Sequence, residues 1–331
     1  MIALIVCYID ELVAMKKVAL CISGKIGNTS GKTGFKKSDP KVLIKAYEHY
    51  KRHIIDKNDV DVFIHCWDTE LSSQIKDLYK PKKAVIEPQK FFKVPRYVKA
   101  SERPWQFKSK RIRRQSIYSR WYSNKIVNLL RNEYEIDNGI VYDFVMTTRF
   151  DIAFEKDIIF SDLDNEYFYA GNWSVVKNKE GKDLFNGGRG ELYDLVKGNK
   201  EILKELEIKN YGYESNQTSL LDLWFISNSI QSTKFFNLFD YLDEYLRPGN
   251  CPLSQDRQRI ISPHLLCVYH LKQIKLDKKI RFKYNMYDDF PLVRRKYYGE
   301  RQIETIRREP RLDRLIRFLK KIKYKLINIL N

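Results

Sequence analysis

The first ninety residues alternate between short apolar runs and helical patterns, and this alternation constrains the fold more than any other feature. Apolar runs, each short enough for a buried strand, are found at residues 17–22, 61–66 and 84–87. Between them, apolar side chains recur at helical spacing after Asp39-Pro40, a typical N-cap followed by proline, and over residues 70–79. Strands that alternate with helices predict an α/β fold with a mostly parallel sheet flanked by helices.

The pattern continues with a long helix and a further strand before it becomes mixed. We predict a basic helix over about residues 109–134, a strand at 142–148 and an apolar strand at 221–226, whereas the glycines of 181–190 are typical of a mobile loop. Further helical patterns are found at about residues 191–207, 232–246 and 255–271. Because no internal repeat or low-complexity linker interrupts the chain, we expect one domain over residues 15–300 with a helical elaboration towards its C-terminal part.

Polar residues follow three of the predicted strands. They are Ser23-Gly24, Trp67-Asp68 and Arg149-Phe150-Asp151. In open α/β sheets, ligands bind outside the carboxyl ends of the strands. We therefore expect these residues to meet at one edge of the sheet and to form the functional site.

Composition excludes several classes of protein. With 43% hydrophobic and 14% aromatic residues, the chain can bury a large core, which excludes a disordered or collagen-like protein. The five cysteines are widely spaced and include no Cys-x-x-Cys pair. That spacing excludes a disulfide framework and a zinc finger and indicates a reducing compartment.

The positive charge of the chain is concentrated in two segments. The net charge is +19, and residues 93–125 hold eleven Lys/Arg against one Glu. Residues 281–331 hold fifteen Lys/Arg against six Asp/Glu, so the two segments together account for the whole excess. Localised positive charge predicts an anionic partner, such as a phosphorylated ligand, a lipid surface or nucleic acid.

The two ends of the chain are predicted to lie outside the domain. The opening apolar run is far shorter than the roughly 20 residues that span a bilayer, and we interpret residues 1–14 as an N-terminal extension. Residues 301–331 include, from Arg311 onward, a basic amphipathic helix that suits an anionic membrane surface. Docking on the protein's own core or on a partner subunit is the alternative. These features predict a cytoplasmic protein, peripheral on the inner face of the membrane.

Arg149-Phe150-Asp151 is the strongest candidate site because it ends a buried strand. A carboxylate there costs desolvation free energy unless it is paired with a cation. The structural interpretation is an ion pair of Arg149 with Asp151 or with Asp143. The functional interpretation is that Asp151 holds Mg²⁺ or Mn²⁺, or positions a ribose or sugar hydroxyl.

A glycine-containing loop after the first strand invites comparison with phosphate-binding loops. Gly27-Asn-Thr-Ser-Gly31-Lys32-Thr33 has three residues between its glycines, whereas the Walker pattern needs four. We therefore predict a flexible polar loop that can close over a ligand. A sulfotransferase, or another transferase with a phosphorylated donor, would use this loop and Lys32 as its phosphate cradle, and this function is kept as an alternative.

Six segments of the sequence, taken in order over about residues 16–270, resemble a known group of enzymes. The segments are ALCISGKIG, DVDVFIHCWD, SIYSRWYSNKIVNLLRNEYE, YDFVMTTRFDIAF, DLWFISNS and SPHLLCVYHL. The group comprises bacterial and large-virus glycosyltransferases with a GT-A-like, Rossmann-like fold that build surface polysaccharide such as lipopolysaccharide or capsule. The resemblance implies a nucleotide-sugar donor and a polysaccharide or lipid-linked glycan acceptor.

The resemblance also implies roles at the end of the fourth predicted strand. In these enzymes an Asp-x-Asp motif at this place binds the metal and the diphosphate of the donor. Here arginine replaces the first acid, so Arg149 is expected to neutralise diphosphate charge. Asp151 is left as a single Mn²⁺ or Mg²⁺ ligand or as a contact to a sugar hydroxyl.

The resemblance further places the donor nucleotide against the ends of the first two strands. Ser23 and Gly24 are expected to lie against it, since a glycine lets a base or ribose approach the backbone closely. Trp67 and Asp68 are expected nearby, with Asp68 accepting ribose hydroxyls. Ordinary aromatic packing in the core is the alternative for Trp67.

The basic helix offers a second set of phosphate-binding residues. Arg113, Ser116, Arg120 and Asn124 lie at helical spacing on one face, which can neutralise a diphosphate leaving group. A solvated basic helix is the alternative. A nucleic-acid groove is also described by basic residues interleaved with aromatic ones, but we favour the leaving-group role.

If the reaction inverts stereochemistry, a carboxylate beside the site is needed to deprotonate the acceptor hydroxyl. Asp222 is the favoured general base, with Glu214 and Asp256 as competitors, so that Arg149 and Asp222 are the predicted catalytic residues. The five histidines show no metal-binding spacing, and His65 and His264 are interpreted as structural.

Overall fold

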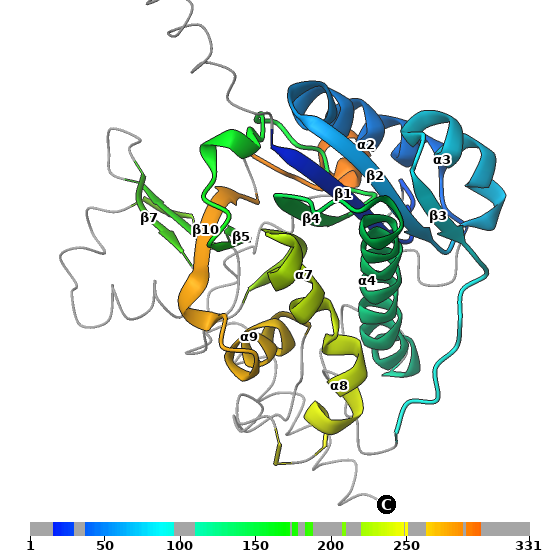
Figure 1. Cartoon of the computed structure of the whole chain (residues 1–331). Helices are drawn as coiled ribbons and strands as arrows, with labels where there is room; N and C mark the ends of the chain where they lie inside the picture. Colours follow the sequence, from blue (N-terminus) through cyan, green and yellow to red (C-terminus); the bar gives the residue numbers. More distant parts are fainter. Residues whose placement is uncertain are drawn as a thin grey trace, which may run out of the picture.

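A seven-stranded, mostly parallel sheet organises the chain, in the strand order β10-β5-β9-β4-β1-β2-β3 (Figure 1). The computed structural model describes residues 16–29, 37–95, 110–172, 174–177, 183–187, 207–209, 220–247, 249–250, 263–286 and 289–298. The strands of the large sheet are β1 Lys17–Gly24, β2 Asp59–Cys66, β3 Lys83–Ile86, β4 Phe144–Arg149, β5 Phe168–Asn172, β9 Leu221–Ser227 and β10 Ile280–Asn285. A three-stranded antiparallel sheet consists of β6 Ser174–Lys177, β7 Asp183–Gly187 and β8 Glu207–Lys209.

Helices cover both faces of the large sheet. They are α2 Pro40–His53, α3 Ser72–Tyr79, α4 Lys110–Asn138, α7 Ser229–Phe236, α8 Leu238–Tyr245, α9 Pro263–Gln273 and α10 Val293–Tyr298. In Figure 1, α2 and α3 lie on one side of β1 and β2, and the long α4 runs along the other. None of the helices in the described part of the chain is long and apolar enough to cross a membrane.

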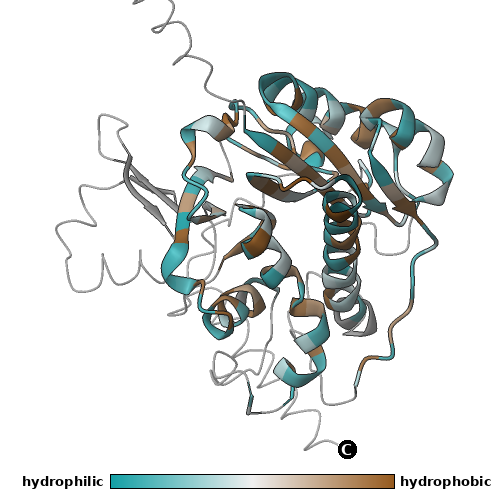
Figure 2. Cartoon of the chain, viewed as in Figure 1, coloured by the Kyte–Doolittle hydropathy of each residue, from teal (hydrophilic) through white to brown (hydrophobic). Residues whose placement is uncertain are grey.

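The alternation of side chains along β1 explains these layers. Val18, Leu20 and Ile22 pack in one core with residues of α2 and α3, whereas Ala19 and Cys21 pack with α4. Successive side chains of a strand point to opposite faces, so an unbroken apolar run is what a strand covered on both sides requires. Figure 2 shows the hydrophobic residues gathered along these central strands.

The predicted fold class is confirmed, and so are most elements of the first half. Asp39 caps α2 by accepting a hydrogen bond from the backbone N–H of Lys41 at 2.9 Å, as the Asp-Pro pair predicts. The strand β9 departs from the parallel pattern, because it runs antiparallel to both β4 and β5. The apolar run at 221–226 predicts the strand itself but contains nothing that fixes its direction.

The second half requires one correction. Residues 181–190 were expected to form a mobile loop, but β7 occupies Asp183–Gly187 within them and pairs antiparallel with β6. Pairing with β6 outweighs the weak strand preference of its glycine, and the local sequence does not report that partner. The helical pattern at 232–246 consists of two helices, α7 and α8, of which α7 is capped by Asn228. The expected helix at about 191–207 lies outside the described residues except for its last position, Glu207, which begins β8 instead. The expected helix at 301–331 and residues 1–14 also lie outside the described residues.

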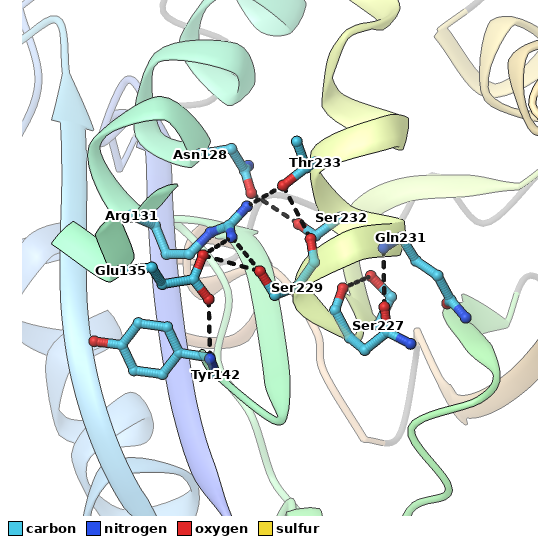
Figure 3. A network of polar contacts seen from close by, with 10 residues as sticks. Asn128, Arg131, Glu135, Tyr142, Ser227, Ser229, Gln231, Ser232 and Thr233 are labelled. Carbon is cyan, nitrogen blue, oxygen red and sulfur yellow. Dashed lines mark hydrogen bonds and ion pairs between the residues drawn. The ribbon is translucent and has the colours of Figure 1, made fainter. Parts of the chain in front are cut away.

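A buried polar network fixes α4 against α7 (Figure 3). The buried guanidinium of Arg131 donates to the carboxylate of Glu135 and to Ser229 Oγ. Its other terminal nitrogen donates to Thr233 Oγ1 at 2.8 Å. Glu135 also accepts from the backbone N–H of Tyr142 at 2.9 Å, which ties α4 to the chain entering β4.

This network predicts a large loss of stability for Glu135→Ala. Removing the carboxylate leaves the buried charge of Arg131 uncompensated, which costs about 3–5 kcal/mol in the free energy of unfolding. Urea unfolding measures the change. Asp137→Ala is the matched control on the same helix, because its ion pair with Lys83 is exposed and contributes about 0–1 kcal/mol. A Glu135→Ala variant as stable as the control would show that the network contributes no stability.

Two buried histidines predict that the protein loses stability in mild acid. Burial lowers the pKa of His65 and that of His270 from 6.5 to about 4. The unfolded chain therefore takes up protons at these positions as pH falls through 6.5, while the folded chain stays neutral until about pH 4. Each histidine should reduce the free energy of unfolding by about 2 kcal/mol at pH 5 relative to pH 7.

Urea unfolding at the two pH values measures this loss. His270→Phe, which cannot be protonated, should remove about 2 kcal/mol of the difference between the pH values, whatever its effect at pH 7. The same acid sensitivity in His270→Phe as in the wild type would refute the assignment to this residue.

Candidate active site

The polar residues that follow the strands meet at one edge of the sheet, as predicted. In the parallel register of β1, Ser23 lies opposite Arg149 of β4, and Gly24 lies opposite Cys66 of β2. The antiparallel β9 begins at this same edge, because its first residue lies opposite Gly171 near the end of β5. The strand therefore brings Asp222 to the edge from the opposite chain direction.

The structural pairing of Arg149 is with Asp151. Arg149 Nε lies 2.8 Å from Asp151 Oδ1, and Arg149 Nη2 lies 2.7 Å from Asp151 Oδ2. The alternative partner, Asp143, instead accepts from the backbone N–H of Lys17 at 2.9 Å. Asp151 is buried, with 2% of its side chain exposed, whereas 29% of the Arg149 side chain is exposed. Arg149, rather than Asp151, is therefore the member of the pair with exposed side-chain surface.

A second arginine, which the sequence does not single out, completes this ion pair. Arg294 Nη1 donates to Asp151 Oδ2 at 3.1 Å. The backbone N–H of Val293 donates to the carbonyl oxygen of Asp151 at 2.9 Å, and a β-bridge joins Leu292 to Ile152. The arginine is buried and stands 143 positions from its carboxylate partner. No local pattern within the basic C-terminal segment distinguishes it from its neighbours.

Asp222 also lies among charged or titratable side chains, those of Arg120 and His264. The Arg120 guanidinium donates to the main-chain oxygen of Asp222, and His264 Nδ1 lies 3.1 Å from Asp222 Oδ1. His264, which the sequence predicts to be structural, is thus in contact with the predicted general base. Burial alone would raise the pKa of Asp222, but the charges of His264, Arg120 and Arg149 outweigh it and hold this pKa below the usual value.

The arginines of this edge form a positively charged group, the guanidinium cluster, which consists of Arg120, Arg149 and Arg294. The cluster carries three positive charges, whereas Asp151 and Asp222 together carry two negative charges. Burial lowers the pKa of Arg120, and the nearby charge of Arg149 adds to this effect. The buried Arg120 Nε has no hydrogen-bond partner among the described residues. This excess of positive charge favours an anionic ligand.

Ser23 and Gly24 differ in what they offer to a ligand. The buried Ser23 hydroxyl donates to Asn124 Oδ1 of α4 at 2.6 Å, so it joins strand to helix. Gly24 has a φ of +104°, and a Cβ placed there would have no heavy atom within 4 Å. The backbone of Gly24 therefore adjoins open space, as expected of a position that a ligand approaches closely.

The side chains of Trp67 and Asp68 contact other residues of the protein. Asp68 Oδ2 accepts from the backbone N–H of Ile26 and from Ser38 Oγ, both at 2.8 Å, and so fastens the two ends of the loop that follows β1. Burial raises the pKa of Asp68, and the carboxyl group has almost no exposed surface with which to meet a ribose. Trp67 stacks on Tyr122 of α4 at 5.6 Å, which is the packing role given as its alternative.

Several predicted residues lie where no side chain is described. The helical turn that carries Arg113 belongs to α4, but its side chain is outside the described residues. The same holds for Lys32 and for the competing bases Glu214 and Asp256. Their predicted roles stay predictions.

The surroundings of Asp151 do not fit a divalent metal ion. Both of its oxygens accept hydrogen bonds from guanidinium groups, so a cation bound there would lie beside the positive charges of Arg149 and Arg294. Over the described residues, no group of three or more His, Cys, Asp or Glu side chains is arranged to hold a metal ion. The expected Mn²⁺ or Mg²⁺ ligation by Asp151 is therefore not supported.

No protein-family model matches the sequence, and a search of curated proteins finds no match. Solved structures with a similar chain course include 4-diphosphocytidyl-2C-methyl-D-erythritol synthase from Anaerococcus prevotii, with 8% identity and a TM-score of 0.35. The alignment covers 84% of this chain and 93% of that one. CTP:phosphocholine cytidylyltransferase from Streptococcus pneumoniae has 12% identity and a TM-score of 0.39, over 86% of this chain and 97% of that one. At these scores the similarity concerns the general course of the chain and not the chemistry of the site.

Proposed function

We propose that the protein is a glycosyltransferase that moves a sugar from a nucleotide-diphosphate donor to a hydroxyl group of a glycan. The observation that carries this proposal is the guanidinium cluster, which gathers at the sheet edge where α/β folds bind ligands. Its partly exposed member, Arg149, is held in a fixed orientation by two hydrogen bonds to Asp151. A preoriented positive charge of this kind stabilises an anionic leaving group.

The reaction breaks the bond between the anomeric carbon and the diphosphate oxygen. The electron pair of that bond leaves with the nucleoside diphosphate, on which negative charge grows in the transition state. Arg149 counters this charge, and because its orientation is fixed before the reaction, little reorganisation is needed as the charge develops. The new bond forms between the anomeric carbon and the acceptor oxygen.

Asp222 is proposed to take the proton of the acceptor hydroxyl. Its lowered pKa keeps it ionised at neutral pH, so that it is in the form that accepts a proton. His264 Nδ1 accepts a hydrogen bond from the Asp222 backbone N–H at 3.2 Å and lies 3.1 Å from Oδ1. The side chain is 13% exposed, at the edge where the acceptor has to approach.

The acceptor is proposed to be a surface polysaccharide or a lipid-linked glycan. This part of the proposal rests on the sequence resemblance and on the basic amphipathic pattern that begins at Arg311, which suits a membrane surface. A peripheral position on the inner face of the membrane would place the site beside a lipid-linked acceptor.

A thermal-shift screen tests the choice of donor. We expect one or more of the UDP-, GDP- and dTDP-sugars to stabilise the protein, by about 2.7 kcal/mol when the donor is present at a hundred times its dissociation constant. CMP-sugars, which carry one phosphate, should stabilise it less. Stabilisation by a nucleotide phosphosulfate or a nucleic acid alone would favour the alternative functions, and no shift with any sugar nucleotide would contradict the proposal.

A further inference from the structure

We infer that the guanidinium cluster binds the donor diphosphate without a bridging metal ion, and that Arg294 is a positioning residue of this anion site. This inference rests on the proposed function for the identity of the anion. It adds how the anion is held and assigns a role to a residue of the C-terminal segment.

Both carboxylate oxygens of Asp151 already accept hydrogen bonds. A carboxylate that bridges a metal to a diphosphate must direct an oxygen at the metal. Both oxygens of Asp151 are directed at guanidinium groups instead, and Oδ2 receives hydrogen bonds from Arg149 and Arg294 together. The positive charge that a metal would supply is thus already present in the two arginines.

Arg149 has N–H groups that are not used by Asp151. Among the described residues, its side chain donates only to Asp151, through Nε and Nη2. The two N–H groups of Nη1 are left for a ligand, on a side chain that is 29% exposed. A guanidinium with one edge fixed on a carboxylate can present its remaining N–H groups to a phosphate oxygen with little loss of side-chain entropy.

The backbone next to Arg294 is held against the residues that follow β4. The strand-like pairing of Leu292 with Ile152, and the hydrogen bond from Val293 to Asp151, hold the start of α10 against the residues that follow β4. Arg294 therefore reaches Asp151 from a fixed backbone. By sharing Oδ2 it offsets the negative charge of Asp151, which would otherwise cancel the charge that Arg149 offers to a diphosphate.

Calorimetric titration with inorganic pyrophosphate tests the inference on the wild-type protein. We expect binding in excess EDTA, with a dissociation constant that 1 mM Mn²⁺ or Mg²⁺ changes by less than about threefold. Binding that appears only with a divalent metal, or no binding under either condition, would overturn the inference. Sugar-nucleotide stabilisation in the thermal-shift screen can succeed in either case, so failure here and failure of the proposed function are distinguishable.

Variants then test the role of Arg294. Arg294→Met should weaken pyrophosphate binding in EDTA by at least about tenfold, and Arg294→Lys should restore part of it, because charge-assisted hydrogen bonds carry the effect. Arg295→Met, which removes the same charge from the neighbouring residue, should leave binding unchanged. Because Arg294 is buried, Arg149→Met serves as a second, partly exposed variant, with the same expected loss. Binding equal to that of the wild type in both methionine variants would overturn the assignment.

Discussion

Replacing Arg149 by alanine is expected to lower kcat/KM for sugar transfer by about 100-fold to 1000-fold, because it removes a preoriented positive charge from the leaving group. The fold should be retained, since Asp151 keeps its hydrogen bond from Arg294 and is not left as an unpaired buried charge. Steady-state release of nucleoside diphosphate measures the effect, with the donor that stabilises the protein most.

The control for this variant is another arginine of the same domain. Arg52 is exposed on α2, and Arg52→Ala should keep the rate of the wild type. Arg149→Lys should recover only part of the rate, because a lysine cannot make the two parallel hydrogen bonds that orient the arginine. Turnover by Arg149→Ala at the rate of the Arg52→Ala control would remove Arg149 from the reaction.

Asp222→Asn is expected to lower the transfer rate by about 100-fold to 10,000-fold, which is the range for loss of a general base. The amide has the shape of the carboxylate but cannot accept the proton of the acceptor hydroxyl. Binding of nucleoside diphosphate, measured by thermal shift, should be nearly unchanged. This separation of rate from binding distinguishes a base from a residue that merely supports the fold.

The pH dependence of the wild type gives a second measure of Asp222. The ordinary pKa of this group is 3.8, and its pKa in the folded protein is lower, so the carboxylate remains a proton acceptor throughout the range from neutral pH down to about 4. Protonation of Asp222 therefore should not produce an acid limb in kcat within that range. For the Asp222→Asn variant, the matched control is Asp240→Asn, on the exposed surface of α8. An Asp222→Asn variant as active as this control would assign the base elsewhere.

The central part of the fold can be predicted from the sequence because its signals are local. Apolar runs of strand length and the Asp39-Pro40 helix start specify β1, α2 and β2, from Lys17 to Cys66. The rule that ligands meet the carboxyl ends of parallel strands then brings Arg149 to the edge that Ser23 also reaches. Neither inference needs knowledge of a distant contact.

The partners of the site residues cannot be predicted in the same way. Arg294 lies 143 residues from Asp151, and His264 lies 42 residues from Asp222, so each contact depends on how the second half of the chain folds back. The direction of β9 decides the edge at which Asp222 lies. An apolar run predicts a strand but does not predict its direction.

Position at the edge also does not decide how a side chain is used. Asp68 lies where the sequence predicts it, directly after β2, yet its carboxylate binds Ile26 and Ser38 of the neighbouring loop. The polar groups of that loop need buried partners, and Asp68 is the acceptor within reach. A residue after a strand can thus support the site instead of touching the ligand.

A crystal structure with a bound nucleoside diphosphate, grown from EDTA-treated protein, tests the central claim most directly. We predict that the diphosphate oxygens lie within hydrogen-bond distance of the Arg149 guanidinium, with Asp151 still paired to Arg149 and Arg294. A nucleotide bound at another edge of the sheet, or a diphosphate that reaches Asp151 only through added Mn²⁺, would contradict the claim that arginines hold the leaving group.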